Sequence, residues 1–172
     1  MFKALIASLV ATAIASPASA ALTQYSNADL LNRGVHPGIV QGFDQLNVPV
    51  FNGSDAALCQ IADGIRPVAF YNFKYNAVLV CEDNVVSPDE FVSSVTHEAV
   101  HMVQDCRNGL QSNTLEAAPS EYLKQLFARL PGYLQDNIVD VYEPSHYAVE
   151  IEAFYFQSRP AAVATGVNRF CF

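Results

Sequence analysis

The segment His97-Glu98-Ala99-Val100-His101 holds the residues whose types and spacing are best suited to chemistry. In a helix, side chains four residues apart lie on one face, so both imidazoles could reach a single metal ion. The Glu98 side chain projects about 100° around the helix axis from His97, beside that ion, where a carboxylate can accept a proton from water. Together these residues predict a hydrolytic zinc site.

The residues around this segment predict a largely buried helix from about Pro88 to Cys106. Apolar residues recur on both sides of the motif, Ser87 is a suitable N-cap, and Glu90 would complete a capping box. Two histidines and a glutamate on a buried helix need a binding partner, because burying them unpaired is costly. A structural pair of histidines without metal is the alternative interpretation.

A catalytic zinc ion usually has three protein ligands, so a third ligand is needed. Glu150 and Glu152 interrupt the apolar segment 147–156, where a carboxylate is costly unless it is paired, exposed or bound to metal. On a helix they lie about 200° apart, so we expect one to face the metal and the other to face water or support a histidine. Asp105, four residues after His101, is better placed to support a histidine.

The motif and the downstream segment Glu150-Ile151-Glu152-Ala153 resemble the gluzincin metallopeptidases. In several gluzincin families the third ligand is the glutamate three residues before an alanine, which corresponds to Glu150. A closer local likeness is to the mitochondrial ATP-synthase-processing metallopeptidases, carried by residues 78–84, 96–101, 104–107 and 150–153. That likeness does not extend to residues 21–65 or to the C-terminus, so the processing role of that family is not carried over.

The chemistry and the resemblance together imply hydrolysis of peptide bonds with one zinc ion per chain, held by His97, His101 and Glu150. Zinc would activate a water molecule and polarise the scissile carbonyl. Glu98 would act as the general base, taking the proton of the water and passing it to the leaving amine.

A hydrogen-bond donor for the developing oxyanion is also expected. His146 is the first candidate, because it precedes Glu150 by four residues and shares its face of the predicted helix. Tyr147 and Tyr155 are alternatives. The other interpretation of His146 is an ordinary residue at the start of a helix.

The first 20 residues are typical of a cleaved export signal. Lys3 gives a basic start, residues 4–15 are apolar but short for a membrane span, and Ala18-Ser19-Ala20 fits a cleavage site. Cleavage would leave 152 of the 172 residues, beginning at Ala21, and would change the net charge from −8 to −9 by removing Lys3. An uncleaved membrane anchor is the alternative.

We therefore expect a secreted or periplasmic protein that does not associate with membranes after cleavage. Its acidic charge argues against nucleic acid as a partner. The site chemistry and the resemblance imply a peptide or protein substrate. The four cysteines predict two disulfides in such a compartment rather than free thiols. Three pairings are possible, and we favour Cys59–Cys81 and Cys106–Cys171.

The remaining pattern predicts one α+β, zincin-like domain over residues 21–172. A small antiparallel β-hairpin, 67–71 and 77–81, precedes the active-site helix, and the strand 77–81 or its neighbour would bind an extended substrate. Tyr71, Phe73 and Tyr75 lie near this hairpin as core or exposed aromatics. The other expected elements are helices at 26–33, 119–130, 133–141, 144–158 and 161–169, a loop at 34–55 with an extended piece at 48–51, and helical turns at 54–62.

Two other functions fit the same residues. The first is a non-catalytic binding or structural domain that is stabilised by zinc. The second is a zinc hydrolase that acts on a bond other than a peptide bond.

Overall fold

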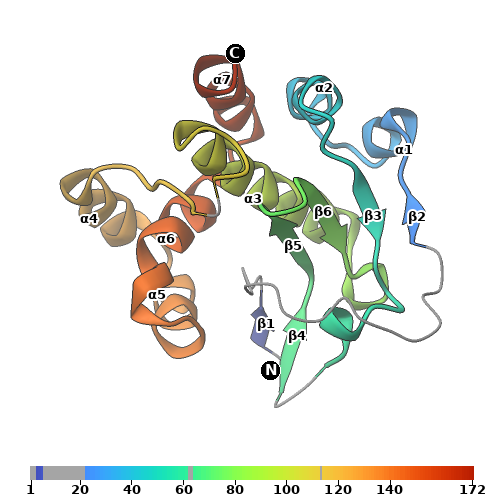
Figure 1. Cartoon of the computed structure of the whole chain (residues 1–172). Helices are drawn as coiled ribbons and strands as arrows, with labels where there is room; N and C mark the ends of the chain where they lie inside the picture. Colours follow the sequence, from blue (N-terminus) through green and yellow to red (C-terminus); the bar gives the residue numbers. More distant parts are fainter. Residues whose placement is uncertain (1–2, 6–21, 62–63, 113) are drawn as a thin grey trace.

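The computed structural model describes residues 3–5, 22–61, 64–112 and 114–172. Within these residues the chain is α+β, with a small mixed sheet, a second pair of strands and seven α-helices (Figure 1). The elements are β1 (Lys3–Leu5), β2 (Thr23–Gln24), α1 (Asn27–Asn32), α2 (Pro37–Gln45), β3 (Val50–Asn52), η1 (Ala57–Cys59), β4 (Ile65–Pro67), β5 (Ala69–Asn72), β6 (Ala77–Val80), η2 (Glu82–Asn84), α3 (Pro88–Arg107), α4 (Ser120–Arg129), α5 (Gly132–Val141), η3 (Pro144–His146), α6 (Tyr147–Phe156) and α7 (Pro160–Phe170).

The main sheet has the strand order β2-β3-β6-β5. β5 and β6 are antiparallel, with Ala69 opposite Val80 and Asn72 opposite Ala77, which confirms the predicted hairpin. β3 runs parallel to β6, so the small sheet that contains the antiparallel hairpin is mixed. β6 is consequently an interior strand, and of the two hairpin strands only β5 lies at an edge of this sheet among the described strands.

The second pair of strands joins β1 to β4 in parallel, with Lys3 opposite Ile65. The expected cleavage site at residues 18–20 lies outside the described residues. No helix among the residues that the structure describes is long and apolar enough to cross a membrane.

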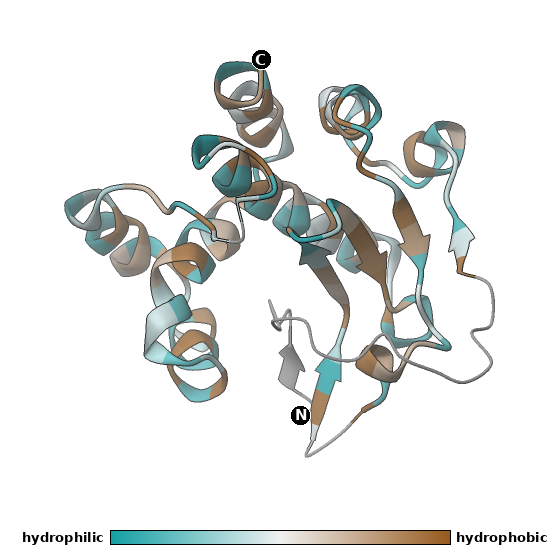
Figure 2. Cartoon of the chain, viewed as in Figure 1, coloured by the Kyte–Doolittle hydropathy of each residue, from teal (hydrophilic) through white to brown (hydrophobic). Residues whose placement is uncertain are grey.

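The central helix α3 packs against the sheet on one side and against α6 and α7 on the other (Figure 1). The Ser87 hydroxyl caps it by accepting a hydrogen bond from the Glu90 amide at 3.1 Å. The Glu90 carboxylate, however, accepts from the amide of Val86 at 2.7 Å and pairs with Arg66, so the capping box predicted between Ser87 and Glu90 is only half formed. Figure 2 shows the hydrophobic strands of the sheet beside this helix.

Helix α2 occupies a segment that was predicted to be a loop because it contains glycine and proline. His36 caps it, with Nδ1 accepting from the Gly38 amide at 3.1 Å. A Cβ on Gly42 would lie 2.5 Å from Cγ1 of Val167, so this glycine lets α2 approach α7 closely. The glycines of α2 therefore allow close packing of helices and do not form turns.

The other predicted helices are present, with small shifts at their ends. The predicted helix 144–158 begins with the 3₁₀ turn η3 and becomes α-helical at Tyr147. Of the helical turns predicted at 54–62, the described residues form only η1. The extended piece predicted at 48–51 corresponds to β3.

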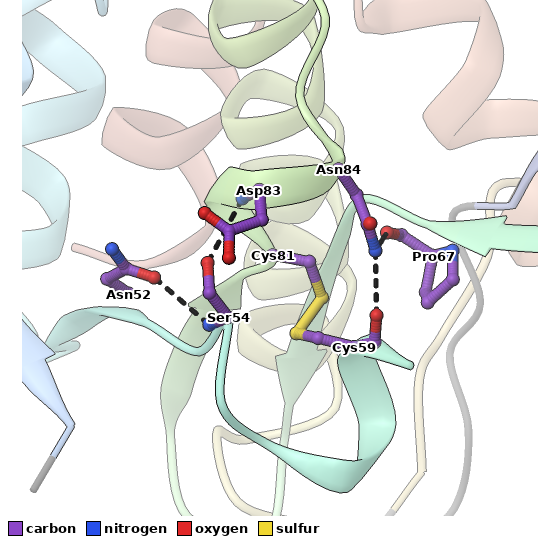
Figure 3. The surroundings of a disulfide bond; sticks show 7 residues. All are labelled: Asn52, Ser54, Cys59, Pro67, Cys81, Asp83 and Asn84. Atoms are coloured by element: carbon purple, nitrogen blue, oxygen red, sulfur yellow. Dashed lines mark hydrogen bonds between the residues drawn. A yellow bond between two sulfur atoms is a disulfide. The ribbon is translucent and has the colours of Figure 1, made fainter. Parts of the chain in front are cut away.

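Both favoured disulfides are confirmed. Cys59–Cys81 joins η1 to the residue after β6, beside Asn84, whose side-chain amide donates to the backbone carbonyls of Cys59 and Pro67 (Figure 3). Cys106–Cys171 joins the last turn of α3 to the residue after α7. Two disulfides are compatible with a secreted or periplasmic protein.

Candidate metal centre

Three buried side chains converge where α3 crosses α6. His97 and His101 come from successive turns of α3, and Glu150 comes from α6. Glu150 Oε2 lies 3.3 Å from His97 Nε2, and Glu150 Oε1 lies 3.5 Å from His101 Nε2. One ligand atom of each residue lies within 4.8 Å of the other two. The three side chains are therefore close enough to hold a metal ion.

The atoms that face one another at this centre lack ordinary partners. His97 Nε2, His101 Nε2 and both Glu150 oxygens are buried without a hydrogen bond of normal geometry among the described residues. Leaving a buried polar atom unpaired costs about 1–3 kcal/mol. Two imidazole nitrogens and a carboxylate can all donate lone pairs to one divalent cation, so this donor set fits a metal ion.

Two glutamines orient the histidines. His97 Nδ1 lies 3.1 Å from Gln157 Oε1, and His101 Nδ1 lies 2.8 Å from Gln104 Oε1. Because an amide oxygen only accepts hydrogen bonds, each Nδ1 carries the proton and donates it. Each Nε2 is thereby left with its lone pair toward Glu150, which is the form that binds metal.

Asp105 does not support a histidine, although its position suggested this role. Its carboxylate accepts hydrogen bonds from the Tyr71 hydroxyl at 2.8 Å and from the Gln111 amide at 3.0 Å. Tyr71 is buried in the core, and its hydroxyl also lies 2.9 Å from the Asn76 side-chain oxygen. Asp105 thus ties the C-terminal part of α3 to the edge strand β5.

Burial controls the protonation of the three candidate ligands. Desolvation lowers the pKa of His97 to about 3 and lowers the pKa of His101, so both imidazoles are neutral at pH 7. Desolvation raises the pKa of Glu150 to about 7, although the nearby His101, His146 and Tyr142 act in the opposite direction. Neutral imidazoles are ready to bind a cation without first losing protons.

Glu98 lies beside the cluster on the side of β5. Its side chain is 1% exposed, and neither carboxylate oxygen has a hydrogen bond of normal geometry among the described residues. Burial, and then the charge of Glu150, raise the pKa of Glu98 well above its usual range, while the backbone amide of Tyr71 acts to lower it. A carboxyl group in this environment is suited to holding and releasing a proton.

Glu152, the other candidate third ligand, is engaged away from the cluster. Both of its oxygens pair with the Arg107 guanidinium, at 2.7 and 2.8 Å. It also accepts from Gln104 Nε2 at 3.1 Å and from the Ala118 amide at 3.2 Å. Glu150 therefore faces the histidines, and Glu152 reaches His101 only through Gln104.

The three residues proposed from the sequence to stabilise the oxyanion have different environments in the structure. His146 lies in η3, is half-buried, and is near enough for its charge to act on Glu150. The Tyr147 hydroxyl donates to the Val139 carbonyl at 3.1 Å, and the Tyr155 ring stacks under the Arg159 guanidinium at 3.9 Å. Both tyrosines are thus held by partners outside the cluster.

Tyr142 is a site residue that the sequence did not reveal. It is buried, and its hydroxyl interacts with the Glu150 carboxylate. Its ring packs against Phe154 at 6.1 Å between centroids, and Phe154 packs in turn against the His97 ring at 4.8 Å. A tyrosine just beyond a helix carries no functional signal in the sequence, because only the crossing of α6 brings it to this place.

No protein-family model matches the chain, and comparisons with curated proteins and with solved structures find no match.

Proposed function

We propose that this protein is an exported, zinc-dependent metallopeptidase with a zincin-like fold and a gluzincin-type site. The observation that carries the proposal is the convergence of His97, His101 and Glu150, whose facing atoms are buried and close enough to hold one metal ion. Glu98, the second residue of the same motif, lies beside this cluster. Two imidazoles and one carboxylate form a ligand set that catalytic zinc commonly uses.

A zinc ion held by His97, His101 and Glu150 would supply Lewis-acid chemistry, making water a stronger nucleophile and polarising the scissile carbonyl. Glu98 takes the proton from the attacking water and delivers it to the leaving amine. Either His146 or Tyr142, both of which lie near Glu150, donates a hydrogen bond to the developing oxyanion. The edge strand β5 offers backbone groups to an extended substrate.

The depth of the site favours a second candidate function. His97, His101 and Glu150 are 0% exposed, so a peptide reaches them only after a local opening of the structure. Such burial is compatible with a zinc ion that stabilises the fold without catalysing a reaction. A zinc-stabilised binding domain is therefore the alternative to the peptidase.

Metal analysis followed by a cleavage assay distinguishes these functions. For a peptidase, we expect about one zinc per purified chain and cleavage of unfolded protein or a peptide library, since three ligands define one site. Glu98→Gln should keep zinc and the folded state but lose at least a hundredfold in rate, because the general base is removed.

Zinc content without cleavage of any peptide would favour the structural alternative, and a panel of ester and amide substrates would then test hydrolysis of other bonds. Purified protein that contains no metal and binds no added zinc would overturn the proposal.

A further inference from the structure

Gln104 links one candidate metal ligand, His101, to the partly buried ion pair of Glu152 with Arg107. Its Oε1 lies 2.8 Å from His101 Nδ1, and its Nε2 donates to the Val149 backbone carbonyl at 3.0 Å and to Glu152 Oε2 at 3.1 Å. All atoms of this chain of contacts are buried, and the Gln104 and Glu152 side chains are 0% and 2% exposed.

The orientation of the Gln104 amide follows from its neighbours. A backbone carbonyl and an ionised carboxylate only accept hydrogen bonds, so the NH₂ group must point to Val149 and Glu152. The amide oxygen is then turned to His101, which must donate from Nδ1. If the amide were reversed, its oxygen would face two acceptors, and its NH₂ group would require His101 to accept at Nδ1 and carry its proton on Nε2.

Glu152 is itself held in one orientation. Arg107 donates to both of its oxygens at 2.7 and 2.8 Å, and the Ala118 amide donates to Oε2 at 3.2 Å. Bidentate pairing with arginine fixes the plane of a carboxylate. The Gln157 amide beside His97 has no such acceptor on its NH₂ group among the described hydrogen bonds, so the two histidines are held unequally.

We propose that Glu152 is a positioning residue for the metal centre, which acts through Gln104 to hold His101 in the tautomer whose Nε2 is free to bind metal. Arg107 contributes by holding the carboxylate in place through two hydrogen bonds. The inference rests on the metal site of the proposed function, but the tautomer itself is a property of the metal-free protein.

The test compares Glu152→Met with the unchanged protein. In this variant Gln104 Nε2 keeps one acceptor, the Val149 carbonyl, and the Arg107 guanidinium loses its carboxylate partner, so the Gln104 amide is no longer held in one orientation. We expect the Nε2–H tautomer of His101 to become populated in the metal-free protein, as read by two-bond ¹H–¹⁵N correlation of the imidazoles. Zinc affinity, measured against a competing chelator, should fall about ten- to a hundredfold.

A conservative substitution at the same position provides the rescue. Glu152→Gln keeps an amide oxygen at the Oε2 position, where Arg107, Ala118 and Gln104 donate, so Gln104 retains both of its acceptors. We expect this variant to keep the Nδ1–H tautomer and most of the zinc affinity. Glu121→Gln is the matched control, because Glu121 is an exposed residue paired with Lys124 at 2.6 Å; it should change neither measurement.

An unchanged tautomer and unchanged zinc affinity in Glu152→Met would overturn the inference, as would a folded Glu152→Gln variant that behaves like Glu152→Met. If Glu152→Met does not fold, Gln104→Met removes the acceptor at His101 while leaving the Arg107–Glu152 pair; a full Nδ1–H preference in that variant would also contradict the inference. Failure of the unchanged protein to bind zinc would instead overturn the proposed function. The tautomer comparison in the metal-free protein would still test the role of Glu152.

Discussion

At the scale of single residues, two glutamates two positions apart in α6 have opposite environments. Glu152 has a donor on each oxygen, whereas Glu150 faces two imidazole nitrogens that have lone pairs to offer. The sequence indicated that one would face the metal, and the resemblance selected Glu150. The bonds of Glu152 depend on Arg107 and on the segment around Ala118, and no pattern local to α6 shows them.

Glu150 gives the metal-free protein a characteristic dependence of stability on pH. Its pKa is about 7 in the folded state and near 4.5 in the unfolded state, so the folded state binds the extra proton between these values. The free energy of unfolding contributed by this group therefore falls as pH rises from 4.5 to 7, by roughly 3 kcal/mol in total.

Glu150→Gln removes the titrating carboxyl group and with it this fall in the free energy of unfolding. In urea unfolding with a chelator present, we expect the variant to gain roughly 3 kcal/mol relative to the unchanged protein between pH 4.5 and pH 7. With zinc present the order should reverse at pH 7, because the variant lacks a ligand. A difference between the two proteins that does not vary with pH would refute this assignment.

At the scale of elements, the contact of α2 with α7 depends on the absence of side chains at glycine. A Cβ on Gly42 would lie 2.5 Å from Cγ1 of Val167, so the Val167 side chain or one of the two helices would have to shift. Gly42→Ala should therefore destabilise the protein by about 1–3 kcal/mol in thermal or urea unfolding.

Gly166→Ala in α7 is the matched control for this prediction. A Cβ there would meet Val103 at 3.6 Å, an ordinary contact, so alanine should be neutral or stabilise by about 0.5–1 kcal/mol through its helix preference. Equal effects at the two positions would show that close packing of α2 on α7 is not the cause.

The elements also show how far local sequence signals extend. The helix carrying His97 was predicted to within one residue at its end, because its cap and its apolar periodicity are local properties. Helix α2 was not predicted because Gly38 and Gly42 are typical of loops. These glycines pack against α7, which lies more than a hundred residues later in the sequence. The parallel pairing of β3 with β6 was missed for the same reason, since register between distant strands leaves no mark on either segment.

At the scale of the whole molecule, the two disulfides enclose loops of different length. Cys59–Cys81 spans 22 residues and Cys106–Cys171 spans 65. Chain entropy predicts stabilisation of about 3 kcal/mol for the shorter loop and about 4 kcal/mol for the longer one.

Replacing each pair by alanine should therefore reduce the free energy of unfolding by these amounts, with the larger loss for Cys106 and Cys171. Urea unfolding of both double variants measures the difference. A larger loss for Cys59 and Cys81 would mean that native contacts around Asn84, rather than chain entropy, dominate the effect of that disulfide.

The enclosure of the candidate metal centre has a kinetic consequence for an ion bound there. A chelator cannot touch an ion among side chains that are 0% exposed, so extraction has to wait for the chain to open. At high chelator concentration, the release rate should level off at the opening rate instead of rising in proportion to chelator. The rate of metal binding should reach the same limit at high metal concentration. The bound ion would then exchange at the rate at which the structure opens, and it would be retained during short periods of low free metal.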